Sequence, residues 1–295
     1  MIRKVKVGGF EVGGERLTII GGPCVIEDID ICMEAAGRMK ELTGSLGLNY
    51  IFKASFAKDN RSSASSYYGP GLDEGLDILA RVRDRYDVPV LSDVHYPEQM
   101  EKAGKVLDVI QIPAYLSQQT ELVLAAARTG KPVNVKKAQF IAPEDMKGAV
   151  SKLRGAGNDR VMLTERGSCF GYRRLVVDIR SLPIMRSLGC PVFFDVTHAI
   201  RIYGYPSSDP RGGEPEFVPY LARAAAACGV DGIFLEVHPE PCRAKCDAAS
   251  MLELSKAGEL LEQVSRIDSI VRQFDLGELG AGEWGAGEPD AGDRG

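Results

Sequence analysis

The sequence predicts a (β/α)8 barrel, also called a TIM barrel, on three observations. Short runs rich in Val and Ile alternate with longer helix-like runs, eight times in all, at a spacing of roughly 30 residues. The short runs are almost continuously apolar, which is typical of parallel strands covered on both faces. An open doubly wound sheet is the alternative, but no GxGxxG turn follows any of the apolar runs.

The eight expected strands alternate with eight expected helices. We expect the strands at residues 17–20, 49–53, 88–93, 109–112, 133–136, 161–165, 192–195 and 233–236. We expect the helices at residues 29–46, 71–86, 98–103, 119–129, 143–155, 179–188, 216–228 and 254–274. Each strand is therefore followed by a helix, as the barrel requires.

The two ends of the chain differ from this repeat. Residues 5–12 predict a β-hairpin that turns at Gly8-Gly9 and caps the bottom of the barrel. After about residue 276 the composition shifts to Gly, Glu, Ala and Asp, which cannot bury a core. We therefore expect a single barrel domain over residues 1–275, including the hairpin at 4–16, and a disordered tail over 276–295.

Composition excludes several classes of protein. The net charge of −5 argues against a nucleic-acid partner, which would require a basic surface. No apolar run approaches the roughly 18 residues of a membrane span. The 7 cysteines show no CxxC pairing, so a reduced cytoplasmic protein is the simplest interpretation.

The loop that follows the second predicted strand is the most informative segment. Residues 52–63 combine three cations with several neutral donors: Lys53, Lys58 and Arg61 with Ser55, Asn60, Ser62 and Ser63. Such groups at a strand end suit a ligand with phosphate or carboxylate groups, because Lys and Arg supply charge-assisted hydrogen bonds. A solvated basic loop is the alternative interpretation.

Polar side chains end nearly every predicted strand, on the rim where barrel enzymes hold their sites. They are Cys24, Lys53, Asp93, His95, Gln111, Lys136, Lys137, Glu165, Arg166, Asp195, His198, Glu236 and His238, and they include all 3 histidines of the chain. Lys53, Lys136 and Arg166 would converge as an anion clamp. Each alone could be a structural ion pair, but clustered like charges are unfavourable without an anionic ligand.

A second group of rim residues has metal-ligand chemistry. Cys24, His198 and Glu236 follow strands that are neighbours in a closed barrel, and Asp247 comes eleven residues after Glu236. One thiolate, one imidazole and two carboxylates suit a divalent transition metal such as Zn, Fe(II) or Mn. The alternative for Cys24 alone is a buried neutral thiol.

Several distinctive motifs are found between about residue 18 and about residue 272. They include Gly21-Gly-Pro-Cys-Val-Ile-Glu27, Phe52-Lys-Ala-Ser-Phe56, Asn60-Arg-Ser-Ser63, Ser92-Asp-Val-His95, Phe194-Asp-Val-Thr-His198 and Glu236-Val-His-Pro-Glu240. Together they resemble the family of 3-deoxy-D-manno-octulosonate 8-phosphate synthases. A sister synthase of the shikimate pathway resembles the chain less, because it typically carries a Pro-Arg-Thr type sequence in place of Asn60-Arg-Ser-Ser63.

The resemblance implies condensation of phosphoenolpyruvate with D-arabinose 5-phosphate and water, a step of lipopolysaccharide precursor synthesis that releases phosphate. It also implies a homotetramer and, because metal-independent members carry Asn at the position of Cys24, the metal-dependent branch. Two alternatives are a related synthase that takes another aldose phosphate, such as erythrose 4-phosphate, and a catalytically silent barrel that binds phosphoenolpyruvate.

The same resemblance assigns roles to individual residues. It implies phosphoenolpyruvate binding by Lys53, Lys58, Lys136 and Arg166, pentose phosphate binding by Asn60, Arg61 and Ser62, and further substrate contacts from Ser55 and Gln111. It implies catalytic roles for Lys53, Asp93, His198 and Asp247. The implied metal ligands are Cys24, His198, Glu236 and Asp247.

The chain departs from the family pattern in several loops. Tyr68 and Pro215 stand where the family usually has Arg, and Arg173-Arg174 replaces an Asn pair. We expect Arg173 or Arg174 to compensate for the lost cations at the sugar-phosphate site.

Overall fold

The computed structural model describes residues 2–60, 63, 65–171, 173–206 and 209–274. Within them, parallel strands close into a barrel in chain order, and the last barrel strand pairs with both the first and the one before it. The barrel strands are β3 (Thr18–Gly22), β4 (Asn49–Lys53), β5 (Val90–Asp93), β6 (Val109–Ile112), β7 (Val133–Lys136), β8 (Val161–Glu165), β9 (Val192–Asp195) and β10 (Gly232–His238). The predicted (β/α)8 barrel is confirmed.

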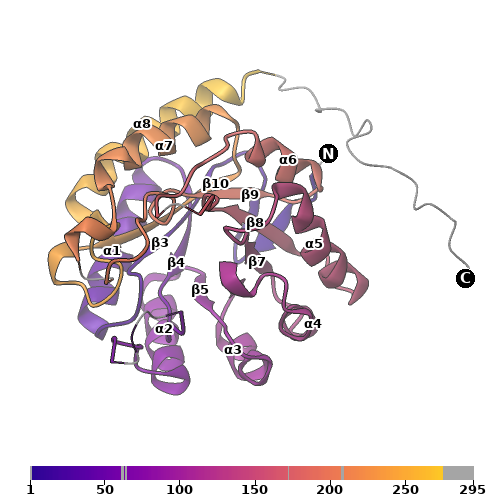
Figure 1. Ribbon diagram of the computed structural model, residues 1–295, viewed down its shortest axis with the longest axis horizontal. Coiled ribbons are helices and arrows are strands. Elements are labelled where there is room, and N and C mark those ends of the chain that lie inside the picture. Colours follow the sequence, from indigo (N-terminus) through magenta and orange to yellow (C-terminus); the bar gives the residue numbers. More distant parts are fainter. Residues whose placement is uncertain (1, 61–62, 64, 172, 207–208, 275–295) are drawn as a thin grey trace, which may run out of the picture.

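Helices surround the strands, as Figure 1 shows. They are α1 (Ile29–Ser45), α2 (Leu72–Tyr86), α3 (Met100–Val106), α4 (Thr120–Arg128), α5 (Met146–Gly155), α6 (Ser181–Ser187), α7 (Val218–Ala227) and α8 (Ala257–Val271). In the described part of the chain, every helix is too short or too polar to cross a lipid bilayer.

Local sequence explains how the helices begin and which face they bury. In α1, the side chain of Asp28 accepts a hydrogen bond of 2.9 Å from the backbone N–H of Ile31, which satisfies one free donor of the first turn. Cys32, Ala35, Ala36, Met39 and Thr43 form the buried stripe of this helix. Their spacing of three and four residues places them on the side that faces the barrel.

Five strands have the predicted bounds, and the remaining differences have local causes. β10 extends to His238 because Val237 and His238 pair with a short parallel strand, β11 (Leu252–Glu253), which the sequence did not indicate. α3 starts at Met100 and α8 at Ala257, since a 3-10 turn precedes each of them.

An antiparallel hairpin closes the amino-terminal end of the barrel. Its strands are β1 (Val5–Val7) and β2 (Phe10–Val12), and Gly8 adopts a positive φ of 52° at the turn. Its buried side chains pack against inward-facing barrel residues: Val5, Val7 and Val12 contact the cluster of Ile20, Ile51, Leu91, Val109, Met162, Phe193 and Phe234. The predicted cap is confirmed. The predicted tail at 276–295 lies outside the described residues.

The inward-facing positions become polar nearer the carboxyl ends of the strands. Side chains two residues apart on a strand face the same way. The next inward-facing side chain therefore lies two residues after each barrel residue that contacts the hairpin. After Ile20 this residue is Gly22, and on the other contacted strands it is Lys53, Asp93, Gln111, Thr164, Asp195 or Glu236, all of them buried. The barrel therefore has an apolar lower layer and a layer of buried charges at its mouth.

Candidate active site

Lys53 and Glu236 form the centre of the polar layer. Lys53 Nζ lies 2.5 Å from Glu236 Oε1, and it donates a 2.7 Å hydrogen bond to the carbonyl oxygen of Cys24. Both side chains are 0% exposed. Burial alone would raise the pKa of Glu236, but the charges of Lys53 and Lys58 outweigh it and hold that pKa well below its usual range.

Lys136 and Asp195 form a second buried pair beside the first. Lys136 Nζ lies 2.5 Å from Asp195 Oδ2 and 3.6 Å from the centre of the Phe234 ring. Burial lowers the pKa of Lys136, although Asp195 opposes the shift. The expected convergence of Lys53 and Lys136 is present, but each has a carboxylate partner. Their mutual repulsion is therefore relieved within the protein and does not by itself require an anionic ligand.

Asp93 accepts contacts from three neighbouring side chains. Ser55 Oγ donates to its Oδ2 at 2.8 Å, Lys58 Nζ lies 3.1 Å from the same oxygen, and Gln111 Nε2 donates to Oδ1 at 2.6 Å. Burial opposes ionisation, but the charges of Lys58, Lys53 and Lys136 hold the pKa of Asp93 well below its usual range. Asp93 is thus an anion at the barrel mouth.

A chain of neutral side chains extends from Asp93 across the barrel. Asn134 Nδ2 donates to Gln111 Oε1 at 2.9 Å, and Thr164 Oγ1 donates to Asn134 Oδ1 at 2.8 Å. Sequence reasoning missed Asn134 and Thr164. Their signal was present, because each is a polar residue at an inward position inside an otherwise apolar strand run.

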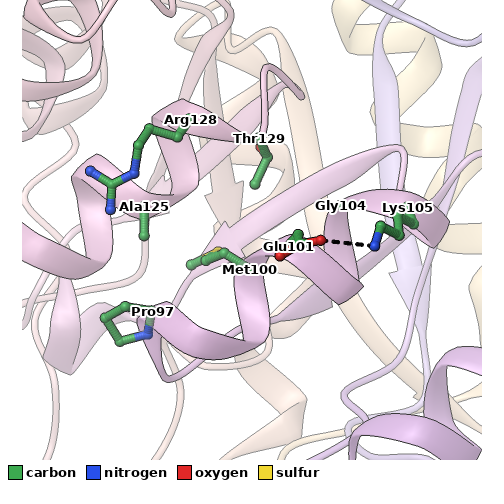
Figure 2. Close-up of a pocket in the computed structure, with 8 residues that line it drawn as sticks. All are labelled: Pro97, Met100, Glu101, Gly104, Lys105, Ala125, Arg128 and Thr129. Atoms are coloured by element: carbon green, nitrogen blue, oxygen red, sulfur yellow. Dashed lines mark hydrogen bonds and ion pairs between the residues drawn. The ribbon is translucent and has the colours of Figure 1, made fainter.

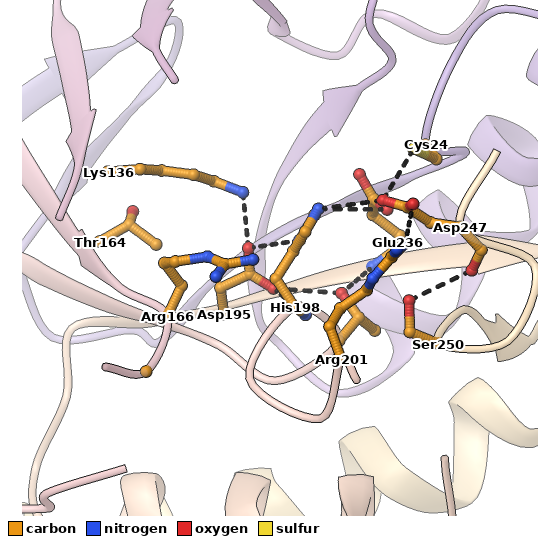
Figure 3. A network of polar contacts seen from close by, with 12 residues as sticks. Cys24, Lys136, Thr164, Arg166, Asp195, His198, Arg201, Glu236, Asp247 and Ser250 are labelled. Atoms are coloured by element: carbon orange, nitrogen blue, oxygen red, sulfur yellow. Dashed lines mark hydrogen bonds and ion pairs between the residues drawn. The ribbon is translucent and has the colours of Figure 1, made fainter. Parts of the chain in front are cut away.

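The four predicted metal-ligand residues lie together. His198 Nε2 lies 3.5 Å from Asp247 Oδ2 and 3.7 Å from Glu236 Oε2, and Cys24 Sγ lies 3.5 Å from Asp247 Oδ2. Figure 3 shows Cys24, Glu236 and Asp247 on one side of His198 and Asp195 on the other. Burial lowers the pKa of His198 despite the nearby carboxylates, so the imidazole favours its neutral, ligating form.

Two observations test whether these residues fit a metal ion. Glu236 Oε2 is buried and has no hydrogen-bond partner among the described residues, although it belongs to an ionised carboxylate. Burial, with Cys246 adding to it, raises the pKa of the Cys24 thiol well above its usual range. The orphaned carboxylate oxygen suits a bound divalent metal, and such a metal would have to displace the proton of the Cys24 thiol on binding.

Comparison with known proteins identifies the family of the chain. A family model described as the DAHP synthetase I family matches residues 4–273. The chain belongs to this family.

Curated relatives cover almost the whole chain. A protein of Geobacter sp. (strain M21) is 51% identical over 274 residues, which is 92% of this chain and 100% of the relative. A relative from Koribacter versatilis (strain Ellin345) is 52% identical over 92% of this chain and 98% of its own length. A relative from Desulfotalea psychrophila (strain LSv54 / DSM 12343) is 50% identical over 88% of this chain and 92% of its own length. All three carry the name 2-dehydro-3-deoxyphosphooctonate aldolase.

In this DAHP synthetase I family member, short structural elements position the loop that carries Asp247. β11 pairs in parallel with the end of β10, and the backbone N–H groups of Ser250 and Met251 donate to the Asp247 carbonyl at 2.9 and 3.2 Å. Asp247 itself has a φ of +49°, which is uncommon for a residue other than Gly. The loop is thus held in one particular conformation at the metal-ligand residue.

Sequence reasoning missed two side chains that contact the metal-ligand residues. Arg201 Nη1 forms an ion pair with Asp247 Oδ1, and Cys246 Sγ lies 2.8 Å from Cys24 Sγ. Arg201 follows β9 in a loop of no regular pattern, so nothing in the sequence indicated its partner. The sequence did indicate that Cys246 lies near the metal-ligand residues, because it directly precedes Asp247.

Arg166 belongs to a separate cluster around one phenol oxygen. Arg166 Nη1 and Gln139 Nε2 donate to the Tyr203 hydroxyl at 2.8 and 2.7 Å, and Tyr115 also hydrogen-bonds it. Burial opposes ionisation, but Arg166 and the hydrogen bonds lower the pKa of Tyr203. Figure 3 shows Arg166 directed toward the same region as Lys136 and His198.

Other expected residues lie at the edge of the site or outside the described part. Asn60 is exposed at the end of the described loop, and Arg61 and Ser62 lie outside the described residues. Arg174 forms a bidentate pair with Glu214, with contacts of 2.7 to 3.1 Å, so its charge already has a partner. Arg173 lies 5.5 Å over the Tyr205 ring.

The hollow drawn in Figure 2 is unrelated to the polar layer. It has a volume of about 370 Å³ and lies between α3 and α4, with Met100, Lys105 and Arg128 on its walls. Its dashed contact is the surface ion pair of Glu101 with Lys105. None of the rim residues lines it, so it is not the candidate site.

Proposed function

We propose that the protein condenses phosphoenolpyruvate with D-arabinose 5-phosphate and water, giving 3-deoxy-D-manno-octulosonate 8-phosphate and inorganic phosphate. One observation carries the proposal: relatives about half identical, aligned over nearly their whole length, bear the name 2-dehydro-3-deoxyphosphooctonate aldolase. The motifs at the strand ends support the same carbon–carbon bond-forming transferase chemistry. The names of these relatives do not favour erythrose 4-phosphate as the acceptor.

In this proposal, phosphoenolpyruvate binds over the polar layer. Lys53, Lys58, Lys136 and Arg166 neutralise its phosphate and carboxylate groups. Ammonium and guanidinium groups held in a buried, pre-arranged site stabilise anions more strongly than mobile ones do, because they need little reorganisation on binding. Asn60, Arg61 and Ser62 are proposed to hold the aldose phosphate, so the loop after β4 joins both substrates.

The chemistry asks for a nucleophilic enol carbon, an aldehyde held against it, and water at C2 of phosphoenolpyruvate. As the enol carbon attacks the aldehyde, positive character develops at C2. Asp93, which its low pKa keeps anionic, is suited to stabilise that charge, and Gln111 fixes the orientation of its carboxylate. His198 is proposed to lie near the reacting atoms as one of the ligands of the divalent ion. Orientation of the two substrates supplies the remaining acceleration.

Cys24, His198, Glu236 and Asp247 would hold a divalent ion, for which Zn, Fe(II) and Mn are the candidates. When bound, such an ion supplies a fixed positive charge that orients the aldehyde oxygen or lowers the pKa of a water molecule. Asp195 supports this arrangement, because its Oδ2 lies 2.8 Å from His198 Nδ1 and orients the ring.

The test is phosphate release from phosphoenolpyruvate with arabinose 5-phosphate, measured before and after chelation and after metal return. We expect release with arabinose 5-phosphate, little with erythrose 4-phosphate, and loss on chelation. No release with any divalent metal would refute the proposal, whereas a rate that resists chelation would refute only the metal requirement. Cys24→Asn tests the metal requirement directly, and Cys190→Asn is its control at a buried position away from the site.

The family resemblance extends this proposal to the whole protein. It supports a cytoplasmic homotetramer with a single barrel domain over residues 1–275. Sedimentation equilibrium measures the assembly directly, and a monomer at working concentration would contradict it.

A further inference from the structure

A second thiol lies beside the expected metal ligands. Cys246 Sγ is 2.8 Å from Cys24 Sγ, and Cys24 Sγ is 3.5 Å from Asp247 Oδ2. The three ligand atoms lie within 4.8 Å of one another, and all three residues are buried. Cys246 is therefore close enough to share an ion with Cys24.

The potential ligands divide into two groups that have Asp247 in common. Cys24, Cys246 and Asp247 form a sulfur-rich group, whereas His198, Glu236 and Asp247 form a nitrogen and oxygen group. Soft thiolates select Zn, Cd and Cu(I), whereas carboxylates suit harder ions such as Mn. The two groups thus differ in the metals that they favour.

We propose that Cys246 is a second thiolate ligand when a thiophilic ion binds. Such an ion gains Cys246 beside Cys24, His198 and Asp247, whereas a harder ion is held by Cys24, His198, Glu236 and Asp247 without Cys246. The inference rests on the proposed metal site and deepens it, because it assigns a ligand that the family resemblance does not.

Stereochemistry and proton balance are consistent with this assignment. Zn–S bonds of about 2.3 Å at a tetrahedral centre place two sulfurs roughly 3.7 Å apart, so the thiols need to separate by only about 1 Å. A thiol that becomes a thiolate ligand releases one proton when the ion binds. No oxidation is involved, and the protons leave to the buffer.

The backbone supports a paired role for the two thiols. Cys246 directly precedes Asp247, so the loop that presents the carboxylate also presents the sulfur. The side chain of Glu27 accepts a 2.8 Å hydrogen bond from the backbone N–H of Lys245, which links this loop to the segment that carries Cys24. The two cysteines therefore come from segments that are tied together.

Cadmium binding provides a test that does not depend on activity. Metal-free, fully reduced protein is titrated with Cd²⁺, and the ultraviolet sulfur-to-cadmium charge-transfer band is measured with the protons released. We compare the wild type with Cys246→Ser, Cys246→Ala, Cys24→Ser and the buried control Cys190→Ser. Circular dichroism confirms folding of each variant.

We expect each Cys246 variant and Cys24→Ser to show about half the band intensity per bound ion and one fewer proton released, because one thiolate of two is lost. Cys190→Ser is expected to match the wild type, and Mn²⁺ affinity is expected to be unchanged in Cys246→Ser.

A full band in both Cys246 variants, with complete loss in Cys24→Ser, would overturn the inference and leave Cys246 as a hydrogen-bond partner only. A wild type with no band at all would remove the proposed metal site itself. The two failures are thus distinguishable.

Discussion

Among the neighbouring cations, Lys58 contributes most to the stability of the Asp93 carboxylate. Lys58 Nζ lies 3.1 Å from Asp93 Oδ2 and both side chains are less than 10% exposed, so solvent screens the pair weakly. Because the folded pKa of Asp93 is lowered, its ionisation stabilises the protein above the ordinary Asp pKa. That contribution is lost as the pH falls through the folded pKa.

Lys58→Met is therefore expected to destabilise the protein in a pH-dependent way. Loss of one partner of a buried pair costs about 3–5 kcal/mol at neutral pH, because a buried carboxylate is left uncompensated. Without Lys58, mainly Lys53 and Lys136 oppose the effect of burial, so the pKa of Asp93 rises, and the deficit narrows as the pH falls from 7 to 4. Urea unfolding at several pH values measures this, and a deficit that stays constant would contradict it.

Tyr203 is expected to position Arg166 rather than to react. Tyr203→Phe removes the oxygen that accepts from Arg166 and Gln139, so the guanidinium becomes free to rotate. We expect the KM for phosphoenolpyruvate to rise about tenfold, equivalent to about 1.4 kcal/mol, with a smaller change in kcat. Tyr205→Phe is the control in the same loop. A fall in kcat with an unchanged KM would contradict the positioning role.

The positions of residues at strand ends could be predicted from the sequence, whereas those of Arg201 and Tyr203 in the loop after β9 could not. Lys53, Asp93 and Glu236 were predictable, because a charged residue that ends an apolar strand has only the barrel mouth as a polar environment. Arg201 and Tyr203 were not, since their positions depend on the path of the loop after β9, which has no periodic pattern. Arg61 and Ser62 lie outside the described residues, so their roles stay predictions.

At the scale of elements, the loop after β9 touches the loop that carries Asp247. A Cβ atom at Gly213 would lie 2.5 Å from the carbonyl oxygen of Ala249, which is closer than real Cβ contacts. Gly213 has an extended backbone, so the obstacle to a larger residue is this contact and not its φ angle. The packing of one loop therefore depends on the absence of a side chain in the other.

Gly213→Ala is expected to displace the Asp247 loop and weaken metal binding. Bound metal would be measured by competition with a chromophoric chelator, and we expect an affinity about tenfold lower, equivalent to about 1.4 kcal/mol. Gly148→Ala is the matched control, because a Cβ there meets nothing within 4 Å. Unchanged affinity in Gly213→Ala would show that the two loops move independently.

Strands and helices were predicted more closely than the short pieces between them. β4, β6, β7, β8 and β9 have the predicted bounds, because a continuous apolar run bounded by polar residues indicates a buried strand. β11 has only two residues, and its pairing with β10 comes from the folded arrangement rather than from any local pattern.

At the scale of the whole molecule, the barrel separates stability from chemistry. The hairpin cluster fills one end with apolar side chains, whereas the charged layer occupies the other. Changes in the lower layer should therefore alter folding and leave the upper layer intact.

Val7→Ala tests this separation. Val7 is 1% exposed, so its truncation is expected to lower the free energy of unfolding by about 2 kcal/mol through lost burial and the cavity left behind. We expect KM values within twofold of wild type, measured beside denaturant unfolding. Lys6→Ala, an exposed position in the same strand, is the control. A large KM change in Val7→Ala would show that the two layers are coupled.

The hairpin also determines how ligands travel. Because its side chains close the amino-terminal end, the two substrates and two products must enter and leave through the mouth at the carboxyl ends of the strands. Lys136 is buried, whereas Asn60 is exposed, so a molecule bound at Lys136 sits beneath one bound at the loop after β4. With the proposed binding roles of these residues, the deeper substrate is expected to bind first and the outer product to leave first. Closure of the amino-terminal end of the barrel thereby imposes an order of binding and release at the carboxyl-terminal end.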